Sequence, residues 1–172
     1  MWYWLIVFID YRRAWLRRPL HVIHNPNPRI SYTITLLSSL SHPYGHYIGE
    51  PRSYSNTSID FFRFVVDLIE KQHLISGDYF IVDNASIHHA RDISQQLSTL
   101  LDTFNIRLIF LPTYSPELNP CELIFAQIKR HLRNRTGHNL FTVDLILAIA
   151  RISLINVIKY YSKCILHNKL DL

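Results

Sequence analysis

The chain has 172 residues, of which 48% are hydrophobic and 13% aromatic, with only 4 glycines; this length and composition fit one ordered domain and exclude a disordered segment. Its formal charge is +5, mostly from arginine, which leaves a polyanionic partner and a merely basic surface both open. The two cysteines, Cys121 and Cys164, exclude a disulfide framework and a zinc-ligand spacing, and they indicate a reducing compartment.

The first third of the chain predicts three strands. The opening MWYWLIVFI is too short to cross a bilayer and has no basic residues before it, so we expect neither a membrane span nor secretion. Its apolar run over residues 5–10 ends at Asp10 and is typical of a strand covered on both faces. A basic loop with several prolines follows. Residues 30–40 and the short run 46–48 then predict two more strands, which can form a meander with the first.

Helices and strands alternate in the rest of the chain, and Thr57 or Ser58 can cap the first helix. In order, we expect a helix over 59–72, a strand over 77–84, a helix over 90–104, a strand over 106–112, a helix over 121–135 and one long final helix over 143–166. Such alternation implies parallel strands. The predicted fold is therefore α/β, with a mixed sheet of a three-strand meander plus parallel strands and helices on both faces, in a single domain over 1–172.

Three acids stand where this fold would gather them. Asp10 closes the first strand and Asp83 the fourth, and ligands of such sheets collect beyond the carboxyl ends of the strands. Glu122 lies in the first turn of a helix, after a loop whose prolines restrict its direction. Carboxylates suit Mg²⁺, and a pair of such ions can activate a hydroxyl and stabilise a leaving oxygen. The three acids are candidate catalytic groups and metal ligands.

Each acid also has a plainer interpretation. Asp83 could form a turn with its own backbone after the strand. Glu122 could simply favour the amino end of a helix dipole, by about 0.3 to 1 kcal/mol. Asp10 could mark where a buried strand reaches solvent. These interpretations stay open on the residues alone.

Basic residues accompany the acids. At about 100° per residue, Lys129 and Arg133 lie on the same side of their helix as the acid in its first turn. With Arg130 beside them, and with Arg12 and Arg13 in the loop after the first strand, they are candidate contacts to DNA phosphates. The alternative for all five is an ordinary solvated surface.

The segments FIVDNASIHHA, IRLIFLPTYSPELNPCELIFAQIKRHLR and VFID resemble the catalytic domain of the DDE superfamily endonucleases, specifically mariner-like and insertion-sequence transposases. The resemblance implies a ribonuclease H-like fold, two Mg²⁺ or Mn²⁺ ions, nicking at transposon ends, and strand transfer into target DNA by the freed 3′-hydroxyl. It implies three catalytic, metal-holding acids and three motif residues that support them: Asp10, Asp83 and Glu122, and Asn84, His88 and Asn119.

The sequence departs from this family in several respects, among them a missing glycine in the loop after the first strand and a slightly longer interval from Asp83 to Glu122. Tyr11 follows Asp10 where similar proteins often have Glu, and no amino-terminal helix-turn-helix is found, so recognition of transposon ends would need another chain. One alternative is therefore a decayed or co-opted transposase fragment that binds DNA or a partner protein without cutting. Another is a stand-alone nuclease of the ribonuclease H type. We expect DNA as the partner and leave a homodimer open, with the protein in the nucleus of a eukaryote or the cytoplasm and nucleoid of a bacterium.

Overall fold

The structure is a computed structural model that describes residues 3–10, 33–49, 51, 57–83, 91–113, 115–133 and 141–166, with the backbone alone at 3–10, 91, 92, 141, 165 and 166. Its strands form one sheet in the order β3-β2-β1-β4-β5. They are β1 (Tyr3–Asp10), β2 (Thr33–Ser38), β3 (His46–Ile48), β4 (Tyr79–Val82) and β5 (Arg107–Phe110). The first three strands form the predicted antiparallel meander, and β4 and β5 run parallel to β1.

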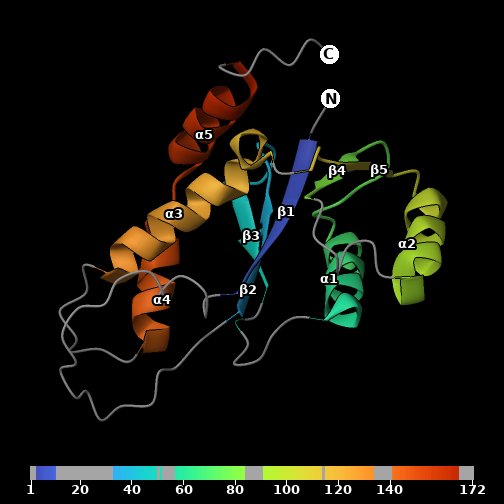
Figure 1. The fold of residues 1–172 in the computed structure, drawn as a ribbon, viewed down its shortest axis with the longest axis horizontal. Helices are drawn as coiled ribbons and strands as arrows, with labels where there is room; N and C mark the ends of the chain where they lie inside the picture. The colour runs from blue at the N-terminus through green and yellow to red at the C-terminus, as the bar shows by residue number, and fades with distance from the viewer. Residues whose placement is uncertain are drawn as a thin grey trace.

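Helices cover both faces of the sheet, as predicted (Figure 1). They are α1 (Ser58–Glu70), α2 (Arg91–Thr103), the short 3₁₀ helix η3 (Pro116–Leu118), α3 (Pro120–Arg133), α4 (Phe141–Ala150) and α5 (Leu154–Leu166). The first helix begins at one of its two expected caps, since the Thr57 hydroxyl accepts from the backbone N–H of Asp60, whose carboxylate accepts from the backbone N–H of Thr57. None of the described helices is long and apolar enough to cross a membrane.

Two apolar cores lie on opposite faces of the sheet. On one face, Leu37, Phe80 and Val82 pack under α1 and α2. On the other, Ile34 and Leu36 pack under α3, α4 and α5. Alternate residues of β2 therefore point into different cores, and all six of its residues are buried. β2 is therefore covered on both faces, and its polar residues Thr33, Thr35 and Ser38 are buried together with its apolar ones.

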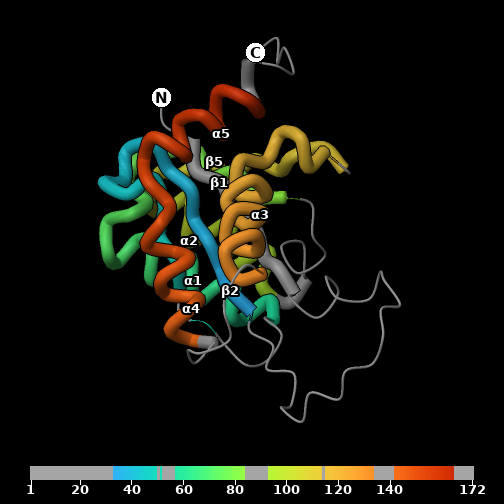
Figure 2. Tube along the Cα trace, turned by 90° about the vertical axis from the view of Figure 1, so that its left-hand side faces the viewer, coloured from blue at the N-terminus to red at the C-terminus, as the bar shows by residue number. Residues whose placement is uncertain are grey.

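The expectation of one long helix over 143–166 is wrong. The chain breaks at residues 151–153, and α4 and α5 follow one another past α3 (Figure 2). The physical reason is a local cap: the backbone N–H and the hydroxyl of Ser153 both donate to Asn156 Oδ1, at 3.2 and 2.8 Å, and the Ser153 hydroxyl accepts from the Asn156 N–H. These hydrogen bonds cap the amino end of a new helix, and they favour a helix start at this point over a continuous helix.

The last helix is tied to the hairpin between β2 and β3. Tyr161 Oη donates to the carbonyl of Ser38 at the end of β2, at 3.0 Å, and both groups are buried. Gly45, in the hairpin turn, lies so close to Val157 that an added Cβ would come within 2.7 Å of the valine side chain. Helix α5 and β2 thereby bracket the amino end of α3, which carries the third acid.

Candidate active site

The ends of β1 and β4 place two of the predicted acids. Asp83 directly follows Val82, which pairs with Ile6 of β1. Asp10 is the last residue of β1, where it pairs with Thr33 of β2. Continuing the register, Asp83 comes level with Val7, so Asp10 lies three residues further along, roughly 10 Å at 3.3 Å per residue. The backbone of Asp10 is thus at the expected strand end, and its side chain lies outside the described residues.

The third acid is held by a capped helix. Asn119 is buried, with 2% of its surface exposed, and its Oδ1 accepts from the backbone N–H of Cys121 at 3.0 Å. Its carbonyl accepts from the N–H of Glu122 at 3.1 Å, and its own N–H donates to the carbonyl of Pro116 in η3. Asn119, predicted as a motif residue, therefore acts as the cap that joins η3 to α3, with Pro120 at the first helical position. Glu122 follows in the first turn.

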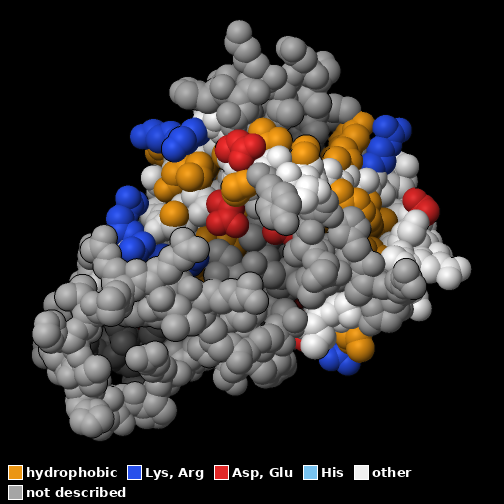
Figure 3. Space-filling model, viewed as in Figure 1, with side chains coloured by type: hydrophobic (Ala, Val, Ile, Leu, Met, Phe, Trp, Pro, Cys, Tyr) orange, Lys and Arg blue, Asp and Glu red, His pale blue; other side chains and the backbone are white. Residues whose placement is uncertain are grey.

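Asp83 and Glu122 come close enough to influence one another. Glu122 is half-buried, and its pKa is raised chiefly by that burial and further by the charge of Asp83, while Lys129 acts in the opposite direction. Lys129 thus lies on the Glu122 side of α3, as the helical spacing predicted. Figure 3 shows acidic side chains near the centre of this face of the molecule, with basic side chains to their left.

Cys121 forms the inner wall of this site, a position that sequence reasoning missed. Its side chain is fully buried, and the pKa of its thiol is raised well above the usual value, first by burial and then by the charges of Glu122 and Asp83. The residue therefore stays neutral and apolar behind the two carboxylates. The sequence could have indicated this position, because Cys121 directly precedes Glu122 in a helix predicted to be amphipathic.

The donor set suits a hard divalent cation. A positive ion beside Glu122 would offset the burial and the charge of Asp83 that raise its pKa, and carboxylate oxygens are the ligands that Mg²⁺ prefers. Within the described part of the chain, no group of three or more His, Cys, Asp or Glu side chains could hold a metal ion. Asp83 and Glu122 could supply two carboxylate ligands to such an ion.

A cationic strip continues along α3. Arg130 and Arg133 are exposed in its last turn, and the Nε of Arg133 donates to the carbonyl of Lys129 at 3.3 Å. Arg151 adds to this strip from the end of α4, with its Nη1 3.5 Å from His131 Nδ1. The pKa of His131 is lowered by burial and by the charges of Arg151 and Arg130.

Four predicted positions lie outside the described residues: Arg12, Arg13, Asn84 and His88. The structure therefore brings together Asp83 and Glu122, with Asn119 beneath them and Lys129 beside them. It leaves the predicted roles of the other positions as predictions.

Comparison with known proteins agrees with this geometry. Residues 33–142, more than half of the chain, match the family described as DDE superfamily endonuclease. This range contains Asp83, Asn119 and Glu122, whereas Asp10 precedes it. No curated protein sequence matches the chain significantly.

Several solved structures share the fold. The catalytic domain of Mos1 mariner transposase is similar at a TM-score of 0.61 and 15% identity, over 94% of this chain and 76% of that one. The Mos1 strand transfer complex gives a TM-score of 0.62 and 16% identity, over 95% and 50%. The catalytic core of BIV integrase gives 0.50 and 14%, over 86% and 80%.

These structural similarities confirm the ribonuclease H-like fold. At such low sequence identities they show the fold alone. The chain spans about half the length of the protein in the Mos1 strand transfer complex. Its match to the family profile, together with two acids brought together at the carboxyl end of β4, shows that this chain belongs to the DDE superfamily endonucleases.

Proposed function

We propose that the chain is the catalytic domain of a transposase, a metal-dependent DNA endonuclease and strand transferase. The observation that carries this proposal is the convergence of Asp83 and Glu122, from the end of a strand and the start of a capped helix. Asp83 directly follows β4 of the sheet, and Glu122 lies in the first turn of a helix capped by Asn119. A metal-dependent phosphodiester enzyme needs carboxylates held in place, because its catalytic groups must be kept close to the productive geometry.

In this proposal Asp83 and Glu122 hold Mg²⁺ or Mn²⁺, with Asp10 as the third acid and two ions in all. When bound, the ions supply Lewis-acid activation of the attacking hydroxyl and stabilise the leaving oxygen. Lys129 opposes the effect of burial and helps keep Glu122 ionised, which a metal ligand requires. Arg130 and Arg133 bind the DNA phosphates beyond the reacting one, since both side chains are exposed along the same helix.

The proposed reaction has two steps on DNA. Water first hydrolyses a phosphodiester at the transposon end, leaving a 3′-hydroxyl. That hydroxyl then attacks a phosphodiester of the target DNA and displaces its 3′-oxygen, so the number of phosphodiester bonds is conserved in the second step. The partners are therefore transposon ends and target DNA, with a homodimer as the form that can hold two ends.

One observation favours a second candidate. Asp10 ends β1 three residues beyond the position level with Asp83. If its carboxylate does not reach the other two, the site lacks its third acid. The chain would then be a decayed or co-opted domain that binds DNA or a partner protein without cutting it.

Nicking of supercoiled plasmid DNA by the purified chain, with Mg²⁺ or Mn²⁺, separates the two. We expect nicking that requires the metal and disappears in Asp83→Asn, Glu122→Gln and Asp10→Asn. The matched control is Glu70→Gln, an exposed acid at the end of α1, which should nick like the wild type.

Two results would contradict the proposal in different ways. Activity that survives in Asp10→Asn but not in the other two variants would remove Asp10 from the site. A folded wild type that binds DNA and never nicks it, with either metal, would establish the second candidate instead.

A further inference from the structure

A buried hydrogen bond joins the last helix to the sheet near the amino end of α3. Tyr161 of α5 is 5% exposed, and its Oη donates to the carbonyl of Ser38 at 3.0 Å. Ser38 ends β2 and is fully buried. A carbonyl in such a place needs a donor, because leaving it without one in apolar surroundings costs stability. The Tyr161 hydroxyl therefore ties α5 to the end of β2, and the proposed reaction does not use it.

Cys121 of α3 faces the same place. Its pKa is raised by burial and by the charge of Glu122, while a hydrogen bond with the backbone of Ser38 acts in the opposite direction. The pKa of Tyr161 is raised in turn, first by burial and then by the charge that a Cys121 thiolate would carry. Both side chains also belong to the core on this face of the sheet. The end of β2 is thus contacted from α3 and from α5.

The contact of Cys121 with Ser38 bears on the next residue, Glu122. Because adjacent residues of a helix are about 100° apart, a fixed direction of the Cys121 side chain also fixes that of Glu122. Turning α3 about its axis, so that Cys121 left Ser38, would change the direction of Glu122 relative to Asp83, whose charge acts on it in this structure. The Asn119 cap fixes where the helix begins, whereas the contact with Ser38 fixes how the helix is turned.

The surroundings of Ser38 offer no ready substitute for the tyrosine hydroxyl. Ser38 and Ser39 are both fully buried, and the Ser38 hydroxyl itself donates to the carbonyl of Gly45 at 3.4 Å. Water at the surface therefore reaches the Ser38 carbonyl only if the backbone moves. Since α5 contacts both η3 and α3, such a movement would be passed to the segments that lead into Glu122.

We propose that Tyr161 is a positioning residue for the nuclease acids. Its hydroxyl holds the end of β2 against Cys121, and so fixes the rotation of α3 that brings Glu122 to Asp83. The inference rests on the proposed function, in which these two acids hold the metal. Tyr161 acts through Ser38 and Cys121 and not by binding DNA, because it is buried in the core.

The neighbouring tyrosine of the same helix provides a matched control. Tyr160 Oη donates to Gln127 Oε1 at 2.6 Å, so it also ties α5 to α3, but beyond the turn that carries Glu122. The variants Tyr161→Phe and Tyr160→Phe each remove one hydroxyl and keep the ring. Both lose a hydrogen bond of α5, and only Tyr161→Phe loses the one at the end of β2.

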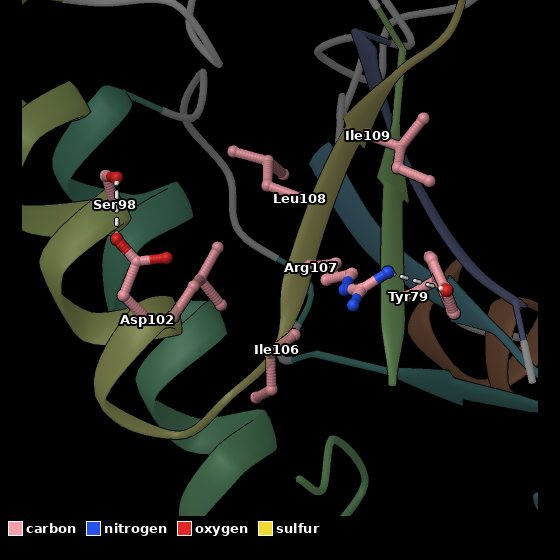
Figure 4. Close-up of a pocket in the computed structure, with 8 residues that line it drawn as sticks. Tyr79, Ser98, Asp102, Ile106, Arg107, Leu108 and Ile109 are labelled. Atoms are coloured by element: carbon pink, nitrogen blue, oxygen red, sulfur yellow. Dashed lines mark hydrogen bonds between the residues drawn. The ribbon is translucent and has the colours of Figure 1, made fainter. Parts of the chain in front are cut away.

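A third tyrosine controls for the strand that leads to the other acid. Tyr79 lies at the start of β4, which Asp83 follows, and its Oη accepts from Arg107 Nη1 at 3.1 Å. Figure 4 shows this pair on β4 and β5, at the outer edge of the sheet. Because the pair is exposed, water can replace the hydroxyl that Tyr79→Phe removes.

The first measurement is the dissociation constant of Mn²⁺ for the whole chain and the three variants, from the electron paramagnetic resonance signal of the free ion. Tyr161→Phe should bind Mn²⁺ roughly tenfold more weakly, as expected when the support of a metal ligand is removed. Tyr160→Phe and Tyr79→Phe should bind like the wild type. Nicking by Tyr161→Phe should fall at low Mn²⁺ and recover at saturating Mn²⁺, with an unchanged KM for DNA.

Amide hydrogen exchange of the metal-free protein gives a second measurement, which does not depend on the proposed function. The N–H groups of Cys121 and Glu122 both donate to Asn119 in the first turn of α3. Tyr161→Phe should speed their exchange more than that of the rest of the helix, and Tyr160→Phe should not. If Tyr161→Phe does not fold, the wild type serves: Mg²⁺ should shift the nuclear magnetic resonance signal of the Tyr161 hydroxyl proton and leave that of Tyr160 in place.

The two measurements separate the inference from the proposed function. A wild type that binds Mn²⁺, with equal affinities in Tyr161→Phe and Tyr160→Phe, would overturn the inference and leave the proposed function standing. Equal exchange at Cys121 in the two variants would overturn it as well, as would a Tyr161 hydroxyl signal that ignores Mg²⁺. A wild type that binds no metal, with faster exchange at Cys121 in Tyr161→Phe alone, would reject the proposed function and support Tyr161 as the residue that positions Glu122.

Discussion

The charge of Asp83 raises the pKa of Glu122, although the two residues lie on different elements and are separated by α2, β5 and η3. The site is therefore assembled at an energetic cost to the folded chain, because burial and a like charge both oppose the ionised form that a metal ligand needs. Carboxylates whose pKa is raised by burial and by a like charge are common at functional sites.

Replacing Glu122 with Gln should stabilise the protein at neutral pH. The pKa of Glu122 is raised in the folded state, so its ionisation costs stability as the pH rises through 4.5, the usual value, to the folded pKa. The gain from Glu122→Gln should be complete above the folded pKa and vanish below about 4.5. Urea unfolding of both proteins between pH 4 and pH 8 measures this, and equal stability at every pH would contradict it.

Adding a divalent metal ion should reverse the difference in stability between Glu122→Gln and the wild type. If Glu122 is a ligand, Mg²⁺ at ten times its dissociation constant stabilises the wild type by about 1.4 kcal/mol. Glu122→Gln should show a much smaller gain, measured as the shift in melting temperature on adding and then chelating Mg²⁺. An equal shift in both proteins would mean that the ion binds elsewhere.

Removing the cap of α3 should weaken both stability and nicking. Asn119→Ala deletes the side-chain acceptor of the Cys121 N–H and should cost about 1 kcal/mol in the free energy of unfolding. Asn119→Ser restores an acceptor and should recover most of the loss. If nicking falls in Asn119→Ala but returns in Asn119→Ser, the cap positions Glu122. Loss of nicking in both, with stability restored in the serine variant, would instead give Asn119 a direct role.

Gly45 and Gly77 allow the stability cost of crowding to be measured apart from the cost of a positive φ. Gly45 has φ of +76° and Gly77 has φ of +90°, a region that costs alanine about 1 kcal/mol or more. Only Gly45 is crowded, since an added Cβ would lie 2.7 Å from Val157, whereas nothing lies within 4 Å at Gly77. We expect Gly45→Ala to lose at least about 1 kcal/mol more than Gly77→Ala in denaturant unfolding. Equal losses would show that the hairpin turn does not pack against α5.

A histidine cluster should make stability fall in mild acid. The rings of His42 and His73 lie 5.1 Å apart, and His73 lies 4.3 Å from the Tyr47 ring. Burial is the main cause that lowers the pKa values of His42, His46 and His73; Lys71 also lowers that of His73, while Asp67 raises it.

Because the unfolded histidines bind protons first, stability should be complete above about pH 6.5 and decline as the pH falls toward the folded pKa values. The variant His73→Gln should show a shallower decline when urea unfolding is measured between pH 8 and pH 5. An unchanged slope would exclude His73 from the effect.

Phosphate contacts along α3 should appear in the salt dependence of DNA binding. Each contact removed by Lys129→Ala or Arg133→Ala should reduce the slope of log affinity against log salt by about 0.9 on duplex DNA. Lys159→Ala, an exposed cation on α5, is the matched control. Slopes that stay unchanged in the α3 variants would place the DNA on another face.

Local features of the site could be predicted from the sequence. The strand ending before Asp83, the helix starting before Glu122 and the position of Lys129 on the same helical side all follow from period, turn residues and spacing. The meander and the parallel strands also follow from the order of the elements. The break before α5 had a local signal in Ser153 and Asn156, which the continuous apolar run around it concealed.

By itself, then, the sequence determined the elements, the alternation that makes an α/β sheet, and which acids stand at element ends, because these depend on near neighbours along the chain. Only the tertiary structure decided that β1 lies between β2 and β4, that Asp83 meets Glu122, and that Asp10 lies three residues past the position of β1 level with Asp83. It also left β5 at an open edge. These are matters of register and packing between distant segments, whose free energy comes from surfaces that meet only when the whole sheet and its two cores have formed.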